Sequence, residues 1–424
     1  MKKKLLSVIL TAAMTAVLLT GCGSTAETTA EAPTAEETAQ TDATAEETAP
    51  AENEAETAAA ETTAASDMKI AIVCDAAGQN DNGYNQSAVE GAEECAESLG
   101  VEYRVVEPTE SIGDTLTTLA EDGYNLIFSM EYDFDALING EAGSDPIAAM
   151  YPDTTFVVFN ATPNNDESGN PIHNNVITVL YNVNESSYLA GALSVLVNEN
   201  ASTLFGEGYN FTPVDEARGL GFIGGSDSNG ITVFSVGYIE GAQYAAEELG
   251  VTYDFYAKYD AGFADSATGS SVAGTYYDQG ANVVYACAGS VGDGVASKAK
   301  EEGKLAIHVD ANKDDQQPGY ILTSVIKNTK VVVNTLTQAL VDGSLNDMDR
   351  LQVYSLESGA TTITDLSTIS ASILDTEDAQ AKWTEIKDYL ADLTTKIGSG
   401  EIKVTDMQNG DTFDESTCPN IKIN

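Results

Sequence analysis

The chain has 424 residues and carries 67 Asp and Glu against 19 Lys and Arg, which gives a formal net charge of −48. A surface this acidic repels the phosphate backbone of nucleic acids and anionic lipid headgroups, so nucleic-acid polymers and polybasic membrane contacts are excluded as partners. Two histidines, His173 and His308, are too few to indicate a zinc centre or histidine-based catalysis. The hydrophobic fraction of 42% is enough for a large buried core.

Residues 1–22 have the pattern of an export signal. Three lysines at positions 2–4 precede a short apolar run, which ends in Leu19-Thr20-Gly21-Cys22. The run is too short for a stable membrane span. Its ending resembles the bacterial lipobox, which implies that Cys22 is lipidated and becomes the mature N-terminus. A plain signal peptide with an incidental cysteine is the alternative. We therefore expect a lipoprotein signal peptide and a protein held on the extracytoplasmic face of the cell membrane through a lipid anchor only.

Residues 23–67 consist almost entirely of Ala, Thr and Glu, with 12 acidic residues and no basic ones. They contain no aromatic residue and no apolar periodicity, so no buried contacts offset the entropy of ordering them. We expect a disordered acidic tether. Without it and the signal, 55 acidic and 16 basic residues remain for 68–424, so the folded part also carries a net charge, of −39.

From residue 68 onward, short apolar runs alternate with amphipathic stretches that close on glycine, the pattern of strands and helices. The first half predicts strands at 69–74, 101–106, 125–130, 155–159 and 177–180 and helices at 85–99, 111–122 and 145–151. The second half predicts strands at 219–223, 252–256, 282–286 and 305–309 and helices at 185–197, 232–249, 266–279 and 292–302. Residues 198–218 interrupt this rhythm and are interpreted as a surface insertion.

Two successive βα runs predict an α/β fold with two doubly wound parallel-sheet domains. Ligands in such sheets bind beyond the carboxyl ends of the strands. The loops that follow the predicted strands are rich in Asp, Asn, Ser and Gly, which suits a neutral polar ligand. These loops span 75–84, 160–165, 224–230, 288–293 and 310–319.

Two motifs suggest other chemistry and do not hold up. The G-x-G-x-x-G pattern at 219–224 falls inside a predicted strand and not in the turn after one, which argues against dinucleotide binding. Asp310-x-Asn312-x-Asp314 opens like a calcium loop but lacks the required Gly and the final Glu. Cys74, Cys95, Cys287 and Cys418 show no disulfide spacing, and we interpret them as buried hydrophobic residues.

Four segments, in order over about 70–345, resemble one family. The first is Ile72-Val-Cys-Asp75-Ala-Ala-Gly-Gln-Asn80-Asp81-Asn-Gly-Tyr84-Asn85-Gln86-Ser87; the second is Glu185-Ser-Ser-Tyr-Leu-Ala-Gly-Ala-Leu193. The third is Gly221-Phe-Ile-Gly-Gly225 with Phe234 and Gly237-Tyr238, and the fourth is Val309-Asp310 followed by Leu322-Thr-Ser-Val-Ile-Lys327. Together they resemble the basic membrane protein family, lipoprotein substrate-binding components of ABC importers for purine nucleosides.

The resemblance implies the type I periplasmic-binding-protein fold, in which two doubly wound lobes close on a ligand through a hinge. We expect residues 68–182 with about 312–350 to form the N-terminal lobe. Residues 183–311 with about 351–424 are expected to form the C-terminal lobe.

The resemblance also implies ligand contacts at ten positions. Tyr84 takes the place of an aromatic residue that stacks on the purine, and Phe263 resembles the aromatic residue of the second lobe. Asp310 and Lys327 match a pair that holds the ribose hydroxyl groups. The predicted ligand-binding set is Asp75, Asn80, Asp81, Tyr84, Asn85, Asn160, Phe263, Gly289, Asp310 and Lys327.

Some of these positions have simpler interpretations. Asp75 could cap the following helix, and Tyr84 could be a surface loop residue. Phe263 could belong to the core, and Lys327 could be a solvated charge. Asn160 also departs from the family pattern, which usually has Asp there, and an amide can donate as well as accept.

We therefore predict a receptor that captures a nucleoside, with a purine nucleoside as the leading ligand, and delivers it to an ABC permease driven by an ATPase. We expect a monomer without catalytic residues, cofactor or metal. A sugar or signalling molecule bound on the same scaffold is one alternative. A nucleoside hydrolase is another, which the lack of a clustered aspartate signature disfavours.

Overall fold

A computed structural model describes residues 67–109, 111–130, 134–140 and 143–424. The predicted signal peptide, the lipidation site Cys22 and the tether up to residue 66 lie outside the described residues. Among the described helices, none has the length and apolar character that a membrane span requires.

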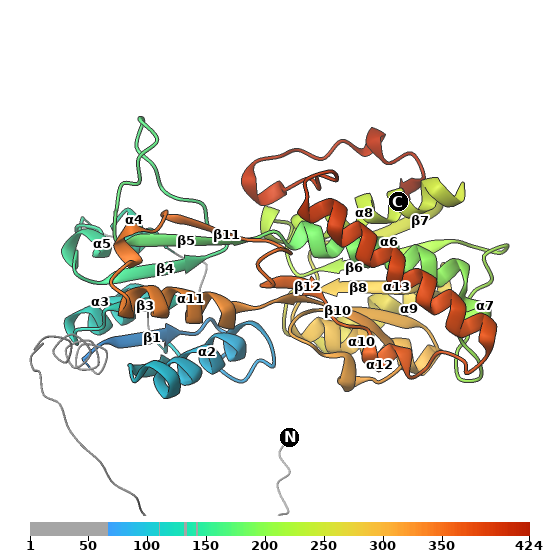
Figure 1. Ribbon diagram of the computed structural model, residues 1–424, viewed down its shortest axis with the longest axis horizontal. Helices are drawn as coiled ribbons and strands as arrows, with labels where there is room; N and C mark the ends of the chain where they lie inside the picture. Colours follow the sequence, from blue (N-terminus) through green and yellow to red (C-terminus); the bar gives the residue numbers. More distant parts are fainter. Residues whose placement is uncertain (1–66, 110, 131–133, 141–142) are drawn as a thin grey trace, which may run out of the picture. The chain divides into compact units, whose positions relative to one another are not determined.

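The first sheet has six strands, all parallel, in the order β11-β5-β4-β3-β1-β2 (Figure 1). We call this sheet and its helices the first lobe. Its strands are β1 (Lys69–Val73), β2 (Glu102–Val106), β3 (Leu126–Ser129), β4 (Thr155–Phe159), β5 (Val176–Tyr181) and β11 (Leu351–Tyr354). Its helical segments are α2 (Tyr84–Leu99), α3 (Ile112–Glu121), α4 (Asp135–Ile138), α5 (Ile147–Met150), α11 (Thr329–Val341) and η2 (Leu345–Asp347).

The second sheet has seven strands in the order β12-β10-β9-β8-β6-β7-β13, with β12 antiparallel to β10 and the other pairs parallel. This sheet and its helices are the second lobe. Its strands are β6 (Gly219–Gly224), β7 (Tyr253–Lys258), β8 (Ala281–Cys287), β9 (Leu305–Asp310), β10 (Ile321–Lys327), β12 (Thr361–Ile363) and β13 (Ile421–Ile423). Its helical segments are α6 (Val183–Glu199), α7 (Ala201–Leu204), α8 (Asn229–Leu249), α9 (Ser266–Asp278), α10 (Ser290–Glu302), η1 (Asp314–Gln316), α12 (Ser367–Ser370), α13 (Glu377–Gly398), η3 (Met407–Asn409) and η4 (Glu415–Thr417).

Both sheets are covered by helices on both faces, as near-continuous apolar strands require. In the first lobe, α2 and α11 pack on one face, where Ile72 and Phe128 point, and α3 to α5 pack on the other, where Val73 and Val158 point. In the second lobe, α6 and α8 cover one face, and α9 and α10 cover the other. These layers confirm the α/β prediction of two doubly wound sheets.

The chain passes between the sheets three times: between β5 and α6, between β10 and α11, and between β11 and β12. The carboxylate of Glu185 joins two of these passages, because its oxygens accept hydrogen bonds from Asn182 Nδ2 (2.9 Å) and from the backbone N–H of Leu356 (2.9 Å). The third passage is tied in by the N–H of Asn328, which donates to the Ala360 carbonyl (2.8 Å).

The lobe boundaries differ from the predicted ones at two points. Residues 312–327, expected in the first lobe, lie in the second, because β10 pairs with β9 and β12. The chain therefore returns to the first lobe at Asn328. Strand β11 was expected in the second lobe, but it pairs with β5 at the edge of the first sheet.

Two glycines, one on each helix, allow α6 and α8 to cross closely. A Cβ atom on Gly191 would lie 2.1 Å from the Tyr238 carbonyl oxygen, and one on Gly241 would lie 1.9 Å from the Tyr188 carbonyl oxygen. No side chain fits at such distances, so the backbones meet directly. Two of the segments that carry the family resemblance thus form one helix crossing.

Residues 198–218 are not a simple surface insertion, and this prediction was wrong. Leu204 and Phe205 are buried in the main hydrophobic core, and the Phe205 ring packs against Tyr209 with centroids 4.5 Å apart. The segment also closes a buried polar network, in which Asn282 Nδ2 donates to Asn198 Oδ1 (2.6 Å). The four cysteines are buried and unpaired, as predicted.

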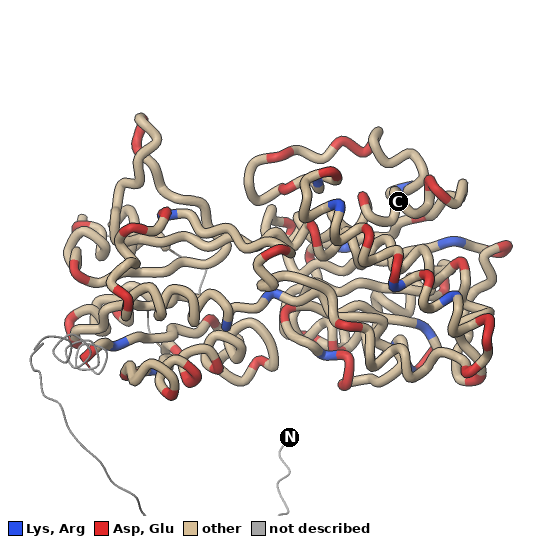
Figure 2. The backbone as a smooth tube through the Cα atoms, in the orientation of Figure 1, with Lys and Arg blue, Asp and Glu red and all other residues tan. Residues whose placement is uncertain are grey.

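Acidic residues are spread over both lobes, while lysines and arginines are sparse (Figure 2). This distribution matches the net charge of −39 counted for residues 68–424. The charge is therefore a property of the whole folded surface and does not mark one face.

Candidate functional site

The predicted site residues gather where parallel strands end. Asp75 follows β1 and Asn160 follows β4 in the first lobe; in the second lobe, Asp310 and Lys327 are the last residues of β9 and β10, and Gly289 follows β8. The carboxyl ends of neighbouring parallel strands share one edge of a sheet, so residues distant in sequence are brought together there.

The loop after β1 is held by its own side chains. Asn85, which is fully buried, donates from Nδ2 to Asp75 Oδ1 (2.7 Å) and to Asp81 Oδ2 (3.1 Å). Asp81 also accepts hydrogen bonds from the N–H groups of Gly83, Asn85 and Gln86 (2.9–3.0 Å), so Asp81, and not Asp75, satisfies the first amides of α2. Asn85 and Asp81 therefore shape this loop, while Asn80 is exposed on it.

The Lys327 side chain is enclosed by three residues of the first lobe. Its ammonium donates to Asn160 Oδ1 and lies 5.3 Å from the ring centroids of both Tyr84 and Tyr181, a cation–π distance. Asn160 Nδ2 in turn donates to the Tyr84 hydroxyl (3.2 Å). Because an ammonium only donates, Lys327 fixes the orientation of the Asn160 amide, with its oxygen toward the lysine.

The electrostatics of this cluster follow from burial. Lys327 is only 6% exposed, and burial lowers its pKa, while the nearby Asp310 acts in the opposite direction. Burial, followed by Asp310, raises the pKa of the adjacent Cys287 thiol well above its usual value. Cys287 is therefore a neutral wall of the cluster and not a nucleophile.

A second cluster surrounds Phe263. The Phe263 carbonyl accepts a hydrogen bond from the Ser290 N–H (2.8 Å), and Gly262 N–H donates to the Gly225 carbonyl (3.0 Å). A Cβ atom on Gly225 would lie 2.3 Å from the Phe263 ring, and one on Gly289 would lie 2.7 Å from the Phe263 carbonyl oxygen. The two glycines thus let the Phe263 loop rest on the ends of β6 and β8.

The simpler interpretations of three residues fail in the structure. Tyr84 is 7% exposed, with its ring edge-to-face with Phe159 at 6.0 Å, so it is not a surface loop residue. Phe263 is 51% exposed and therefore not part of the core, and Lys327 is buried and not solvated. Of the two predicted aromatic contacts, Phe263 has the accessible ring.

Backbone strain also concentrates here. Four described residues other than glycine have positive φ, and two of them are Asn160 (59°) and Asp310 (74°), both at strand ends in the candidate site. This left-handed region is costly for most residues, although Asn and Asp tolerate it. Non-glycine residues held in such conformations cluster at functional sites.

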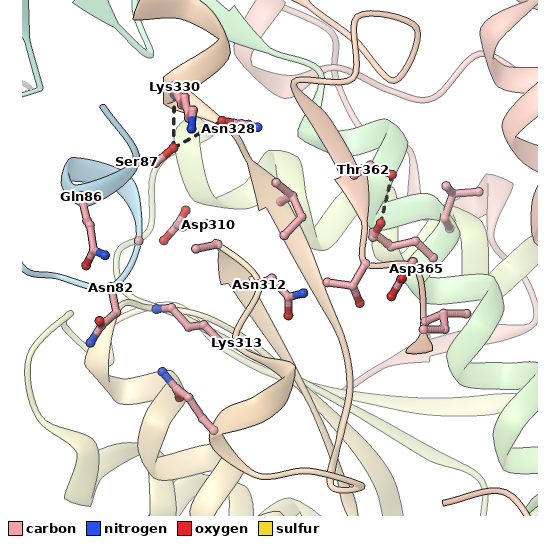
Figure 3. Close-up of a pocket in the computed structure, with 18 of the residues that line it drawn as sticks. Asn82, Gln86, Ser87, Asp310, Asn312, Lys313, Asn328, Lys330, Thr362 and Asp365 are labelled. Atoms are coloured by element: carbon pink, nitrogen blue, oxygen red, sulfur yellow. Dashed lines mark hydrogen bonds between the residues drawn. The ribbon is translucent and has the colours of Figure 1, made fainter. Parts of the chain in front are cut away.

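A large cavity adjoins the predicted site at Asp310, the last residue of β9 (Figure 3). It has a volume of about 1080 Å³ and shares only Asp310 with the ten predicted residues. Its walls come from the start of α2, the loop after β9, β12 and α13, so both lobes contribute. Among the described residues, no group of His, Cys, Asp and Glu side chains is placed to hold a metal ion.

Sequence reasoning missed Tyr181 and Lys313. Tyr181 ends β5 at the same edge as Asn160, so its position at the end of an apolar run was the available signal. Lys313 lies in a loop that was noted for its acidic residues, and only its burial reveals it. The other predicted contacts are placed near one another, but their contact with a ligand stays a prediction.

Comparison with known proteins gives a consistent result. Residues 68–407 match the family model described as ABC transporter substrate-binding protein PnrA-like. The ABC transporter nucleoside-binding protein BmpA of Lactococcus lactis is 28% identical over 80% of this chain and 89% of its own length. An uncharacterized lipoprotein of Pyrococcus abyssi is 29% identical over 66% of each chain.

A solved structure supports the same fold. The solute-binding protein of an ABC transporter system from Aeropyrum pernix superposes with a TM-score of 0.64 at 21% identity, covering 82% of this chain and 95% of its own. The match to the family model extends over most of the chain and includes every strand of both sheets except β13. The chain therefore belongs to the PnrA-like family of ABC transporter substrate-binding proteins, which are binding proteins and not enzymes.

Proposed function

We propose that this protein is a lipid-anchored receptor that binds a nucleoside, with a purine nucleoside as its preferred ligand, and delivers it to an ABC permease. The observation that carries the proposal is the pairing of an accessible aromatic ring, Phe263, with a polar cluster around Lys327, both at the carboxyl ends of strands. A nucleoside has a flat base and a hydroxylated sugar, which require these two kinds of surface.

The base stacks on Phe263 in this proposal. Base–aromatic stacking contributes about 1–3 kcal/mol per base in other proteins. Phe263 is the large hydrophobic residue with 51% exposure at the end of the second sheet, and Gly225 and Gly289 allow its loop to lie flat. Purines have the larger ring system, which favours them over pyrimidines at a stacking surface.

The sugar binds between Asp310 and Lys327. Among the described residues, the Asp310 carboxylate has no hydrogen bond or ion pair, so its oxygens are available to accept from ribose hydroxyl groups. The Lys327 ammonium uses one N–H on Asn160 and supplies the others to ligand oxygens. Asn160 also has one N–H beyond the one given to Tyr84, which can donate to the base.

Several observations support delivery to a permease and the lipid anchor. The family model is that of ABC transporter substrate-binding proteins, and one relative is named a nucleoside-binding protein and another a lipoprotein. The lipobox-like ending at Cys22 fits an anchor on the extracytoplasmic face. Closure of two lobes on a ligand then provides a surface that a permease can distinguish from the open form.

Native mass spectrometry of the leader-free protein tests the ligand class. The protein is incubated with an equimolar mixture of adenosine, guanosine, inosine, uridine, ribose and galactose, and the retained ligand is identified from its mass. We expect a purine nucleoside to be retained. Retention of ribose or galactose in its place would show that the scaffold serves a sugar, and the nucleoside proposal would then be wrong.

A further inference from the structure

The cavity of Figure 3, which we call the inter-lobe groove, is electrostatically unlike the rest of the protein. Residues 68–424 hold 55 acidic and 16 basic residues, whereas the groove is lined by equal numbers of each. Its charged lining residues are Lys313, Lys330 and Lys387 against Glu90, Asp310 and Asp365. The groove is therefore a locally neutral, polar surface within an acidic protein.

Lys313 is the unusual member of this lining. Its side chain extends into the groove toward Asn82 (Figure 3), yet the residue is only 6% exposed. No hydrogen bond or ion pair joins its ammonium to any residue in the described part of the chain. Two carboxylates are near, because Asp310 flanks the same point and the charge of Lys313 acts on Asp293, but neither bonds to the ammonium. A buried ammonium is stable when its N–H groups are hydrogen-bonded, so these donors are available to the oxygen atoms of a ligand.

The loop that carries Lys313 is built to hold it in place. The N–H of Lys313 donates to Ser324 Oγ (3.0 Å), and Ser324 Oγ donates to the carboxylate of Asp314 (2.7 Å). The other oxygen of Asp314 accepts from Thr364 Oγ1 (2.7 Å), and the Asp314 N–H donates to Asn312 Oδ1 (3.1 Å). These hydrogen bonds fix the Lys313 backbone to β10 and to Thr364, which follows β12. The ammonium therefore lacks a bonded partner although its loop is held firmly in place.

Asp310 lies on the other side of the same position. A Cβ atom on Gly83 would lie 3.5 Å from Asp310 Cβ and 3.7 Å from Lys313 Nζ, so the acid and the lysine flank one point without forming an ion pair. The amides at the start of α2 cannot serve an incoming anion, because Asp81 already accepts from them. This part of the groove therefore offers one cation, Lys313, and one separate hydrogen-bond acceptor, Asp310.

We propose that the inter-lobe groove binds a small hydroxylated organic oxyanion, a carboxylate or a phosphate, whose charge pairs with Lys313 and whose hydroxyl group donates to Asp310. This site does not include Phe263 or Lys327, but it shares Asp310 with the proposed sugar contacts, so an oxyanion and a nucleoside compete for that carboxylate. Its ligand class goes beyond the nucleoside function. Because its walls come from both lobes, an occupant binds one relative arrangement of the lobes better than others.

Calorimetric titration of the purified full-length protein tests the proposal. The probes are glycerol 3-phosphate and glycerate, which carry a phosphate or a carboxylate beside hydroxyl groups, and glycerol, which is neutral. The variants are Lys313→Met, which removes the charge from a side chain of similar length, and Lys313→Arg, which keeps it. Lys403→Met, at an exposed lysine outside the groove lining, is the matched control for net charge.

We expect the wild-type protein to bind at least one oxyanion about tenfold or more tightly than glycerol, because a hydrogen bond to a charged group is among the stronger polar contacts. Lys313→Met should lose about tenfold in that affinity, while Lys313→Arg and Lys403→Met stay within about twofold of wild type. The proposal is overturned if glycerol binds as tightly as both oxyanions, a comparison that needs no variant, or if Lys313→Met binds them like wild type. Nucleoside binding is measured separately, so either proposal can fail alone.

Discussion

Replacement of Phe263 by Ala tests the stacking surface with little disturbance of the fold. The side chain is 51% exposed, and its loop is held by backbone hydrogen bonds to Ser290 and Gly225, which the substitution leaves in place. We therefore expect the free energy of unfolding to change by less than about 1 kcal/mol, as for most exposed positions. Tyr84→Ala is a poorer test, because Tyr84 is buried and its loss would create a cavity.

The expected effect on binding is large by comparison. Stacking of a base on an aromatic ring contributes about 1–3 kcal/mol, which corresponds to a loss of about 5- to 150-fold in nucleoside affinity. Ribose has no base, so its affinity should be unchanged. The assay is calorimetric titration of the wild-type and variant proteins with adenosine and with ribose.

A matched control is Val353→Ala, which removes another exposed apolar side chain (47%) at the edge of the first sheet and should leave both affinities unchanged. Equal losses for adenosine and ribose in the Phe263 variant would refute the stacking argument, as would no loss for either. Phe263→Trp, which keeps an aromatic face, should retain nucleoside binding.

Two further predictions concern stability. Gly241→Ala should lower the free energy of unfolding by about 1–3 kcal/mol, because its Cβ would lie 1.9 Å from the Tyr188 carbonyl oxygen. Gly398→Ala, at the end of α13 where a Cβ meets open space, is the control and should not destabilise the protein; urea unfolding measures both variants. Burial lowers the pKa of Lys304 to about 8, so above pH 8 the unfolded chain holds a proton that the folded chain has released. Relative to Lys304→Met, the wild type should therefore gain stability from about pH 8 to 10.5 and show no further change below pH 8; parallel pH profiles would contradict this.

The fold was predictable because its signals are local. Buried strands such as β1 and β8 are continuous apolar runs, and helices such as α2 and α8 end at glycines with positive φ, so both kinds of element can be recognised without tertiary information. Strands β12 and β13 have three residues each, too few for a periodic pattern. The lobe that β10 joins depends on its pairing with β9, which no residue of β10 encodes by itself.

The candidate site was predictable in part for a similar reason. Asp75, Asp310 and Lys327 stand at the ends of apolar runs, so their place at the edge of a sheet follows from the pattern. The hydrogen bond from Asn160 to Tyr84 joins residues 76 positions apart. Such contacts depend on the packing of one strand end against one helix start, and only the structure reveals them. The burial of Lys313 in the groove is likewise visible only in the structure.

The most direct test of the nucleoside proposal is a calorimetric comparison of one purine nucleoside with free ribose on the leader-free wild-type protein. We expect adenosine or guanosine to bind at least about fivefold more tightly than ribose, because the base adds a stacking contact that the sugar lacks. Ribose binding as tightly as both nucleosides, or no binding of either nucleoside, would contradict it.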